Sequence, residues 1–195
     1  MAPEETMKKW LPFLYIIIAS CAAPQKPVEV RAVSGRPIRC MILIEESLGG
    51  RRNDPGNTQS ESILAAALGA AFEVAGADVA RASARKLGIR IDESLTGIID
   101  PVIKDYLIGE LRMDVVIIGR VSLRPDSSGV IADIADMELR AVRLSDDAVL
   151  AHATARVRKT TPPDYTVKEM LNELVRVTIM RDSPDFREKI IMKIR

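Results

Sequence analysis

Histidine, cysteine and aromatic side chains are scarce in this sequence. Its 195 residues include one histidine, His152, two cysteines and only 4% aromatic residues. A zinc site or a nucleophile–base pair needs several such side chains, and no second histidine is present to join His152. His152 also falls on the polar side of an alternating run, where an exposed residue is expected. This scarcity argues against a metal site and against histidine-dependent catalysis.

An excess of charge of either sign is also missing. Lys and Arg number 28 against 27 for Asp and Glu, which leaves a net charge of +1. A chain this balanced lacks the basic footprint of a nucleic-acid-binding protein. Carboxylates gather at Asp133, Asp136, Asp146 and Asp147, but a charged strand edge and turn explain them better than acid–base chemistry. We therefore expect neither an enzyme nor a nucleic-acid partner.

No apolar run near the N-terminus is long enough for a transmembrane helix. The stretch Leu11–Ile18 is about half of the ~20 residues that cross a bilayer. It follows Lys8 and Lys9 and precedes the small residues Ala19 and Ser20. A positive start, a short apolar centre and small residues at the cut are typical of a secretory signal, which here predicts a signal peptide at residues 1–20.

The end of this segment, Ile18-Ala19-Ser20-Cys21, resembles the lipobox of bacterial lipoproteins. The resemblance implies a diacylglyceryl thioether on Cys21 and an acylated (palmitate-bearing) amino group, with no other cofactor. Several acyl chains anchor a protein stably. In Gram-negative lipoproteins, Asp at the position of Ala22 commonly favours retention in the inner membrane. For a Gram-negative source the resemblance therefore implies the outer membrane, facing the periplasm. The alternatives are an ordinary secretory signal with a chance cysteine, or a cytosolic protein with an apolar start.

The rest of the chain predicts a tether and one domain. Residues 21–36 contain Pro24, Pro27 and Gly35 and are typical of a flexible linker from lipid to domain. Residues 37–195 are enough for a single globular domain with its own core. Once Cys21 carries lipid, only Cys40 remains, so no internal disulfide can form. Cys40 lies in an apolar strand pattern and is expected to be a small buried hydrophobe.

The periodicity of apolar residues predicts an α/β (α+β) fold, with a mixed sheet of about 4–5 strands packed against helices. We expect a bulge near Ala141, a helix start at Asp100-Pro101, and a capping box at Thr166 and Glu169. The predicted elements are strands at 38–44, 78–82 and 114–121, a polar loop at 45–59, a helix at 60–76 ending on Gly76, a helix from 100, a hairpin over 135–157, and helices from 166 and 183.

Three segments are candidates for binding. Gly49-Gly50-Arg51-Arg52 follows the first strand, and glycines beside arginines can form an anion-binding nest, although a flexible loop is the simpler interpretation. The segment lacks the Lys-Ser/Thr ending of a phosphate-binding P-loop. The Arg120–Arg124 stretch is a weaker candidate. The C-terminal segment from Phe186 carries four basic residues among isoleucines. It could contact a membrane surface or a partner, or it could pack on the domain, and we favour packing on the domain.

The arrangement resembles a superfamily of envelope lipoproteins. Residues 114–121, Asp-Val-Val-Ile-Ile-Gly-Arg-Val, resemble its "aDyvi-G-v" strand, and residues 137–149 stand where the group has a hairpin with an "l-l-lvd-tGevv" pattern. The group includes the curli secretion-channel lipoprotein, the activators of penicillin-binding proteins and the N-terminal domain of the Tol propeller protein. The resemblance covers residues 38–159. The hairpin glycine is missing after Asp147, and small residues replace an aromatic on the following strand.

These observations predict a non-enzymatic lipoprotein that binds another envelope protein. Its system would be cell-wall synthesis, secretion, the flagellum or transport. One alternative is a structural subunit that assembles into a ring or other homo-oligomer. Residues 38–159 leave no room for two additional membrane-spanning hairpins, so a pore is not expected. The other alternative is an envelope hydrolase or small-ligand binder that uses the loop after the first strand.

Overall fold

A computed structural model describes residues 35–49, 51–53, 55–56, 58–88, 99–125, 132–158 and 166–195. The chain divides into two compact units, Met1–Ser34 and Gly35–Arg195, and every described element belongs to the second. The predicted signal peptide, Cys21 and most of the tether lie outside the described residues and stay predictions. Within the described part of the chain, no helix is both long and apolar enough to span a membrane.

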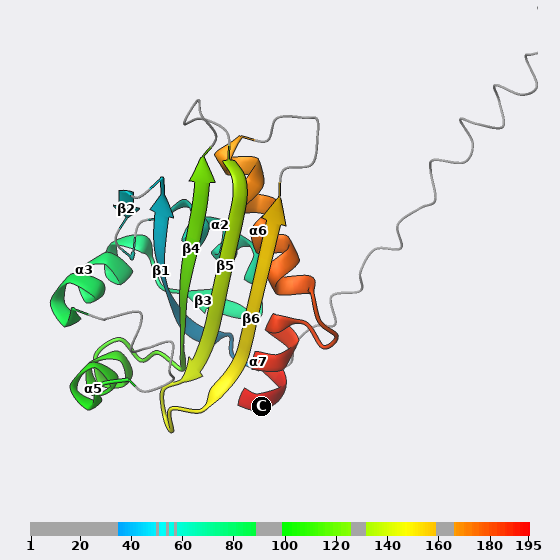
Figure 1. Cartoon of the computed structure of the whole chain (residues 1–195). Helices are drawn as coiled ribbons and strands as arrows, with labels where there is room; N and C mark the ends of the chain where they lie inside the picture. The colour runs from blue at the N-terminus through cyan, green and yellow to red at the C-terminus, as the bar shows by residue number, and fades with distance from the viewer. Residues whose placement is uncertain are drawn as a thin grey trace, which may run out of the picture. The chain divides into compact units, whose positions relative to one another are not determined.

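The described elements form one mixed sheet with helices on both of its faces (Figure 1). In chain order they are β1 Ile38–Leu48, β2 Arg51–Asn53, α2 Gln59–Leu68, β3 Phe72–Val74, α3 Ala77–Leu87, α5 Pro101–Gly109, β4 Val115–Pro125, β5 Ala132–Arg143, β6 Val149–Arg158, α6 Val167–Met180 and α7 Phe186–Ile194. The strand order is β2-β1-β4-β5-β6, and β3 also pairs with β1. The β1 strand runs parallel to β3 and β4, and the remaining pairs are antiparallel. The predicted fold class is confirmed.

The first strand is central because its side chains are apolar on both faces. Cys40, Ile42 and Ile44 pack with α2, α6 and α7, whereas Met41 and Leu43 pack with α3 and α5. All five are at most 3% exposed. Burying a side chain of this size contributes about 1.5–3 kcal/mol relative to leaving it in water, so the near-continuous apolar run fixes β1 between two helical layers.

The stretch between the first strand and Asp100 differs from the prediction. The helix predicted at 60–76 ends at Leu68, because Gly69 takes a φ of +73°, and the chain then turns into β3. In β3, Phe72 pairs with Ile38 of β1. Gly76 is the N-cap of α3 and not a C-terminal cap, and the predicted strand at 78–82 is helical. Alanine-rich apolar spacing alone did not reveal this break.

The signals carried by capping residues and by alternation are confirmed. The Asp100 carboxylate accepts a hydrogen bond of 2.8 Å from the Val102 amide at the start of α5. Thr166 and Glu169 form the predicted capping box of α6. The register between β5 and β6 shifts at Ala141, where the bulge was expected.

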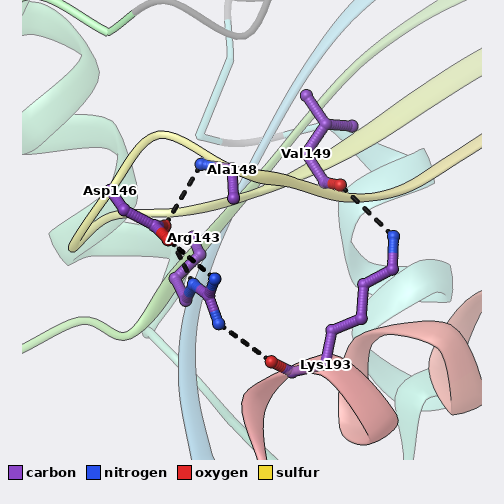
Figure 2. A network of polar contacts seen from close by, with 5 residues as sticks. All are labelled: Arg143, Asp146, Ala148, Val149 and Lys193. Carbon is purple, nitrogen blue, oxygen red and sulfur yellow. Dashed lines mark hydrogen bonds and ion pairs between the residues drawn. The ribbon is translucent and has the colours of Figure 1, made fainter.

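The C-terminal helix packs on the domain. Phe186 and Ile190 are at most 2% exposed and belong to the core. Figure 2 shows how the end of α7 is held against the turn between β5 and β6. Arg143 forms two hydrogen bonds with the Asp146 carboxylate and donates a third, of 2.9 Å, to the Lys193 carbonyl. The Lys193 ammonium donates in turn to the Leu150 carbonyl at 2.7 Å.

Candidate functional site

The predicted interaction loop is a tight hairpin in the structure. β1 continues to Leu48, and Arg51 and Arg52 begin β2, which pairs back onto β1. The polar loop expected at 45–59 is therefore partly strand. Gly49 has a φ of +54°, and its amide donates to the Leu123 carbonyl at 3.2 Å, so this amide is occupied. Gly50 lies outside the described residues, and a binding role for the hairpin stays a prediction.

The strand motif contains two residues without a large apolar side chain, Asp114 and Gly119, and each has a structural role in the sheet. Asp114 accepts hydrogen bonds from the Arg36 guanidinium at 2.7 Å and from the Arg39 amide at 3.0 Å, which joins the starts of β1 and β4. Gly119 lies where a Cβ would come within 2.5 Å of Leu139 Cδ2 and 2.7 Å of the Glu138 carbonyl oxygen. Both motif residues are therefore explained by packing.

Two buried carboxylates join β1 to the start of α2. Glu61 accepts hydrogen bonds from the amides of Ile44, Gly56 and Thr58 at 2.7, 2.8 and 2.9 Å. Glu46 accepts from both the amide and the hydroxyl of Ser60. Burial raises the pKa of Glu61 above its usual value, and the three amide donors oppose that rise. The Glu61 contacts join Ile44 of β1 to the start of α2, and Glu46 of β1 contacts Ser60 of α2, so we assign both carboxylates a structural role.

The remaining candidates for chemistry are also satisfied locally. His152 is half-exposed, and its Nε2 lies 3.1 Å from a Glu138 oxygen. Cys40 is fully buried, and burial raises the pKa of its thiol to about 12, so it is not a nucleophile at neutral pH. Asp146 and Asp147 pair with Arg143 and with a lysine of α5. Among the described residues no group of three or more His, Cys, Asp or Glu could hold a metal ion.

One face of the sheet changes from apolar to polar side chains halfway along its strands. On β4, Val116 and Ile118 are buried against the α3–α5 layer, and Arg120, Ser122 and Arg124 continue the same face. This polar half of β4, β5 and β6 is turned toward the viewer in Figure 1, with α6 and α7 behind the sheet. We call it the open face, and its side chains are Arg120, Ser122, Arg124, Asp136, Glu138, Arg140, His152, Thr154, Arg156 and Arg158.

Charges on the open face lie in cross-strand rows. Asp136 stands between Ser122 of β4 and Arg156 of β6, and its carboxylate forms an ion pair with Arg156. The next row places Glu138 between Arg120 and Thr154. Opposite charges in directly paired positions stabilise a sheet by only about 0.2–1 kcal/mol each, so these rows contribute little to folding.

The open face contains a shallow hollow of about 440 Å³. Its lining residues include three arginines, two acidic residues and two hydroxyl residues: Arg120, Arg156, Arg181, Asp136, Glu138, Ser122 and Thr154. Arg181 reaches in from the end of α6 and donates to the Thr154 carbonyl at 2.7 Å, on the free edge of β6. Nearby, the Nε of Arg140 is buried without a hydrogen-bond partner in the described part of the chain. The hollow is therefore lined by side chains of both charges, with arginines in the majority.

The charged and polar side chains of the open face are suited to recognition. Its two carboxylates already contact Arg156 and His152, and none of its described side chains is a nucleophile activated by a base. Sequence alternation predicted a polar side for the hairpin, and Arg120–Arg124 was the weaker candidate of the sequence. What the sequence did not reveal is that β4 and the hairpin bring these residues onto one surface.

Comparison with known proteins gives only distant likenesses. No protein-family model matches the sequence, and no curated protein matches it either. Among solved structures, the lipoprotein GNA1162 from Neisseria meningitidis is similar over 74% of this chain and 96% of its own, with a TM-score of 0.44 and 14% identity. The LpoB C-terminal domain from Salmonella enterica is similar over 65% of this chain and 87% of its own, with a TM-score of 0.41 and 11% identity. At identities and TM-scores this low, neither structure contributes to the function proposed below.

Proposed function

We propose that the protein is a lipid-anchored, non-enzymatic adaptor of the bacterial envelope, which binds another envelope protein through the open face. The lipobox-like sequence at Cys21 supports an anchor, with the outer membrane facing the periplasm as its place. The observation that carries the binding role is the open face itself, a half-sheet of charged rows around an arginine-lined hollow.

Arginine is the reason to expect a protein as the partner. Its planar guanidinium binds carboxylates with two parallel hydrogen bonds, and arginine is enriched in protein–protein interfaces. The open face presents arginines from three neighbouring strands, interleaved with Asp136 and Glu138. A mixed pattern of this kind favours a partner with its own alternating charges over a uniformly charged polymer, because like charges placed opposite each other are costly.

The anchor and the binding surface are tested separately. A Cys21→Ser precursor should lose lipid labelling and membrane association, and retention of both would contradict the anchor. For the surface, a photo-crosslinking residue is placed at Ser122 or Thr154 in the anchored protein in intact cells. The matched control carries the same residue at Arg85, which is exposed on α3 and is not one of the open-face residues.

We expect one discrete adduct from each open-face position and none from the control. Arg156→Glu should weaken the adduct at Ser122 without unfolding the protein, because the Arg156 side chain is 63% exposed. Equal adducts from Arg85, or adducts insensitive to Arg156→Glu, would contradict the open face as the docking surface. A hydrolase or small-ligand binder would require chemistry in the β1–β2 hairpin, where the described residues provide no such group of side chains.

A further inference from the structure

The helical layer opposite the open face has an apolar groove between α2 and α6. Its volume is about 670 Å³, and its lining includes Ile63, Ala66 and Ala67 from α2 with Val175, Ile179 and Met180 from α6. Small alanines keep the groove open, and Met180 is 60% exposed at its side. An exposed apolar groove of this size is typical of an interaction site, whereas isolated exposed apolar residues are common on any protein surface.

The rim of the groove is basic. Lys168, Arg176 and Arg187 line it, and no Asp or Glu is among its lining residues. Arg176 and Arg187 have partners in Glu173 and Asp185, whereas Lys168 has no ion-pair partner in the described part of the chain. The groove therefore fits an apolar helix face that carries acidic residues, the arrangement of helix-in-groove recognition.

The chain itself carries such a face on α5. Val102 is 74% and Ile108 is 40% exposed, and Asp105 is exposed between them on the same side of the helix, since residues three apart differ by about 60° in direction. Asp105 has no ion-pair partner among the described residues, and the Lys104 of α5 is already paired with Asp147 at 2.7 Å. The exposed side of α5 is therefore apolar and acidic.

The two surfaces also agree in length. At 1.5 Å per residue, the nine residues of α5 extend about 14 Å and the ten residues of α2 about 15 Å. They lie on opposite faces of the sheet, because α5 packs with the core of Met41 and Leu43 and α2 with the core of Ile42 and Ile44. One copy cannot bring its own α5 into its own groove.

We propose that the protein self-associates head to tail, with α5 of one copy in the α2–α6 groove of the next. This contact goes beyond the adaptor function and uses none of the open-face residues. Contact between two like surfaces is disfavoured. Two grooves that face each other would bring the Lys168 side chains of the two copies together, and two α5 helices in contact would bring the Asp105 side chains together. A contact between unlike surfaces repeats, and it gives rings or filaments according to the rotation between copies.

The test measures association by sedimentation velocity over a concentration series, with the chain that begins at Ala22, because every described element belongs to the compact unit Gly35–Arg195. Val102→Lys disrupts the α5 surface and places a cation against the basic rim. Met180→Asp disrupts the groove and places an anion against Asp105. The matched controls are Met192→Asp, which is 61% exposed on α7, and Val79→Lys, which is 42% exposed on α3.

We expect the unaltered chain and both controls to sediment faster as their concentration rises, whereas Val102→Lys and Met180→Asp each remain monomeric. Their equimolar mixture should form a dimer and nothing larger, since each variant keeps one intact surface and these two surfaces are complementary. A wild-type chain that stays monomeric throughout overturns the proposal. So does a mixture that stays monomeric, an association that either control abolishes, or one that survives in either α5 or groove variant.

Discussion

Removal of the Glu61 carboxylate should destabilise the fold far more than its place in a helical first turn suggests. Among the described residues, the edge of β1 opposite β4 is paired at its two ends, with β3 at residues 38–40 and with β2 at residues 46–48. Between them the Ile44 amide donates to Glu61. The same carboxylate accepts from the Gly56 and Thr58 amides. Glu61→Ala therefore leaves three amide donors without their acceptor.

The expected loss follows from those three donors. A buried donor left without a partner costs about 1–3 kcal/mol, and the removal of a carboxylate that is itself penalised by burial offsets part of this. We expect Glu61→Ala to lower the free energy of unfolding by about 4 kcal/mol. A domain of ordinary stability, about 5–15 kcal/mol, would remain mostly folded, so the loss can be measured.

The structure provides a matched control in Glu169, which occupies the same capping-box position in α6. Its carboxylate accepts only from the amide and hydroxyl of Thr166, and these contacts are exposed. Glu169→Ala should therefore cost about 1 kcal/mol. With a urea dependence of about 2 kcal/mol per molar, the unfolding midpoints should fall by about 2 M and about 0.5 M respectively. Equal shifts for the two variants would refute the assigned role of Glu61.

Three further outcomes are expected. Because burial raises the pKa of Glu61, the folded state gains protons more readily than the unfolded state, so the wild type should gain stability relative to Glu61→Gln as pH falls from neutral toward about 4.5; a pH-independent difference would contradict this. Gly119→Ala should lower the free energy of unfolding by about 3 kcal/mol in urea titrations, because its Cβ would meet Leu139 and the Glu138 backbone; an unchanged midpoint would show that β4 and β5 can separate freely there. Cys40 should resist an aromatic disulfide reagent in the native state and react at once in denaturant, and rapid native labelling would contradict its burial.

The parts of the fold that could be predicted are those in which local chemistry and tertiary packing agree. Asp100 and Thr166 carry side chains that satisfy the first amides of a helix, so the helix starts were correct. The hairpin was found because each of its strands has one face in the core. The Ala141 bulge was found because Val142 and Leu144 break the alternation of apolar and polar residues.

The failures lie where a long-range contact decides the local structure. Alanines near residue 70 are compatible with a continued helix, and only pairing with Ile38 makes Phe72 part of a strand. Glu45 and Glu46 looked like the start of a loop because charged residues seldom continue a central strand. The structure buries Glu46 against Ser60, and a single sequence gives no sign of that contact.

The sequence also restricts the kind of partner that the open face can meet. Fourteen residues lie between Cys21 and Arg36, and the fifteen Cα–Cα steps that join these two residues span at most about 50 Å in any conformation. An adaptor held by lipid on Cys21 could therefore bind only partners that come close to its membrane. A protein confined to the opposite membrane, with no segment that extends into this layer, would stay out of reach however complementary its charges. The proposed anchor would thus select partners by their distance from the membrane, and the proposed binding through the rows around Arg156 and Asp136 would select among them by charge.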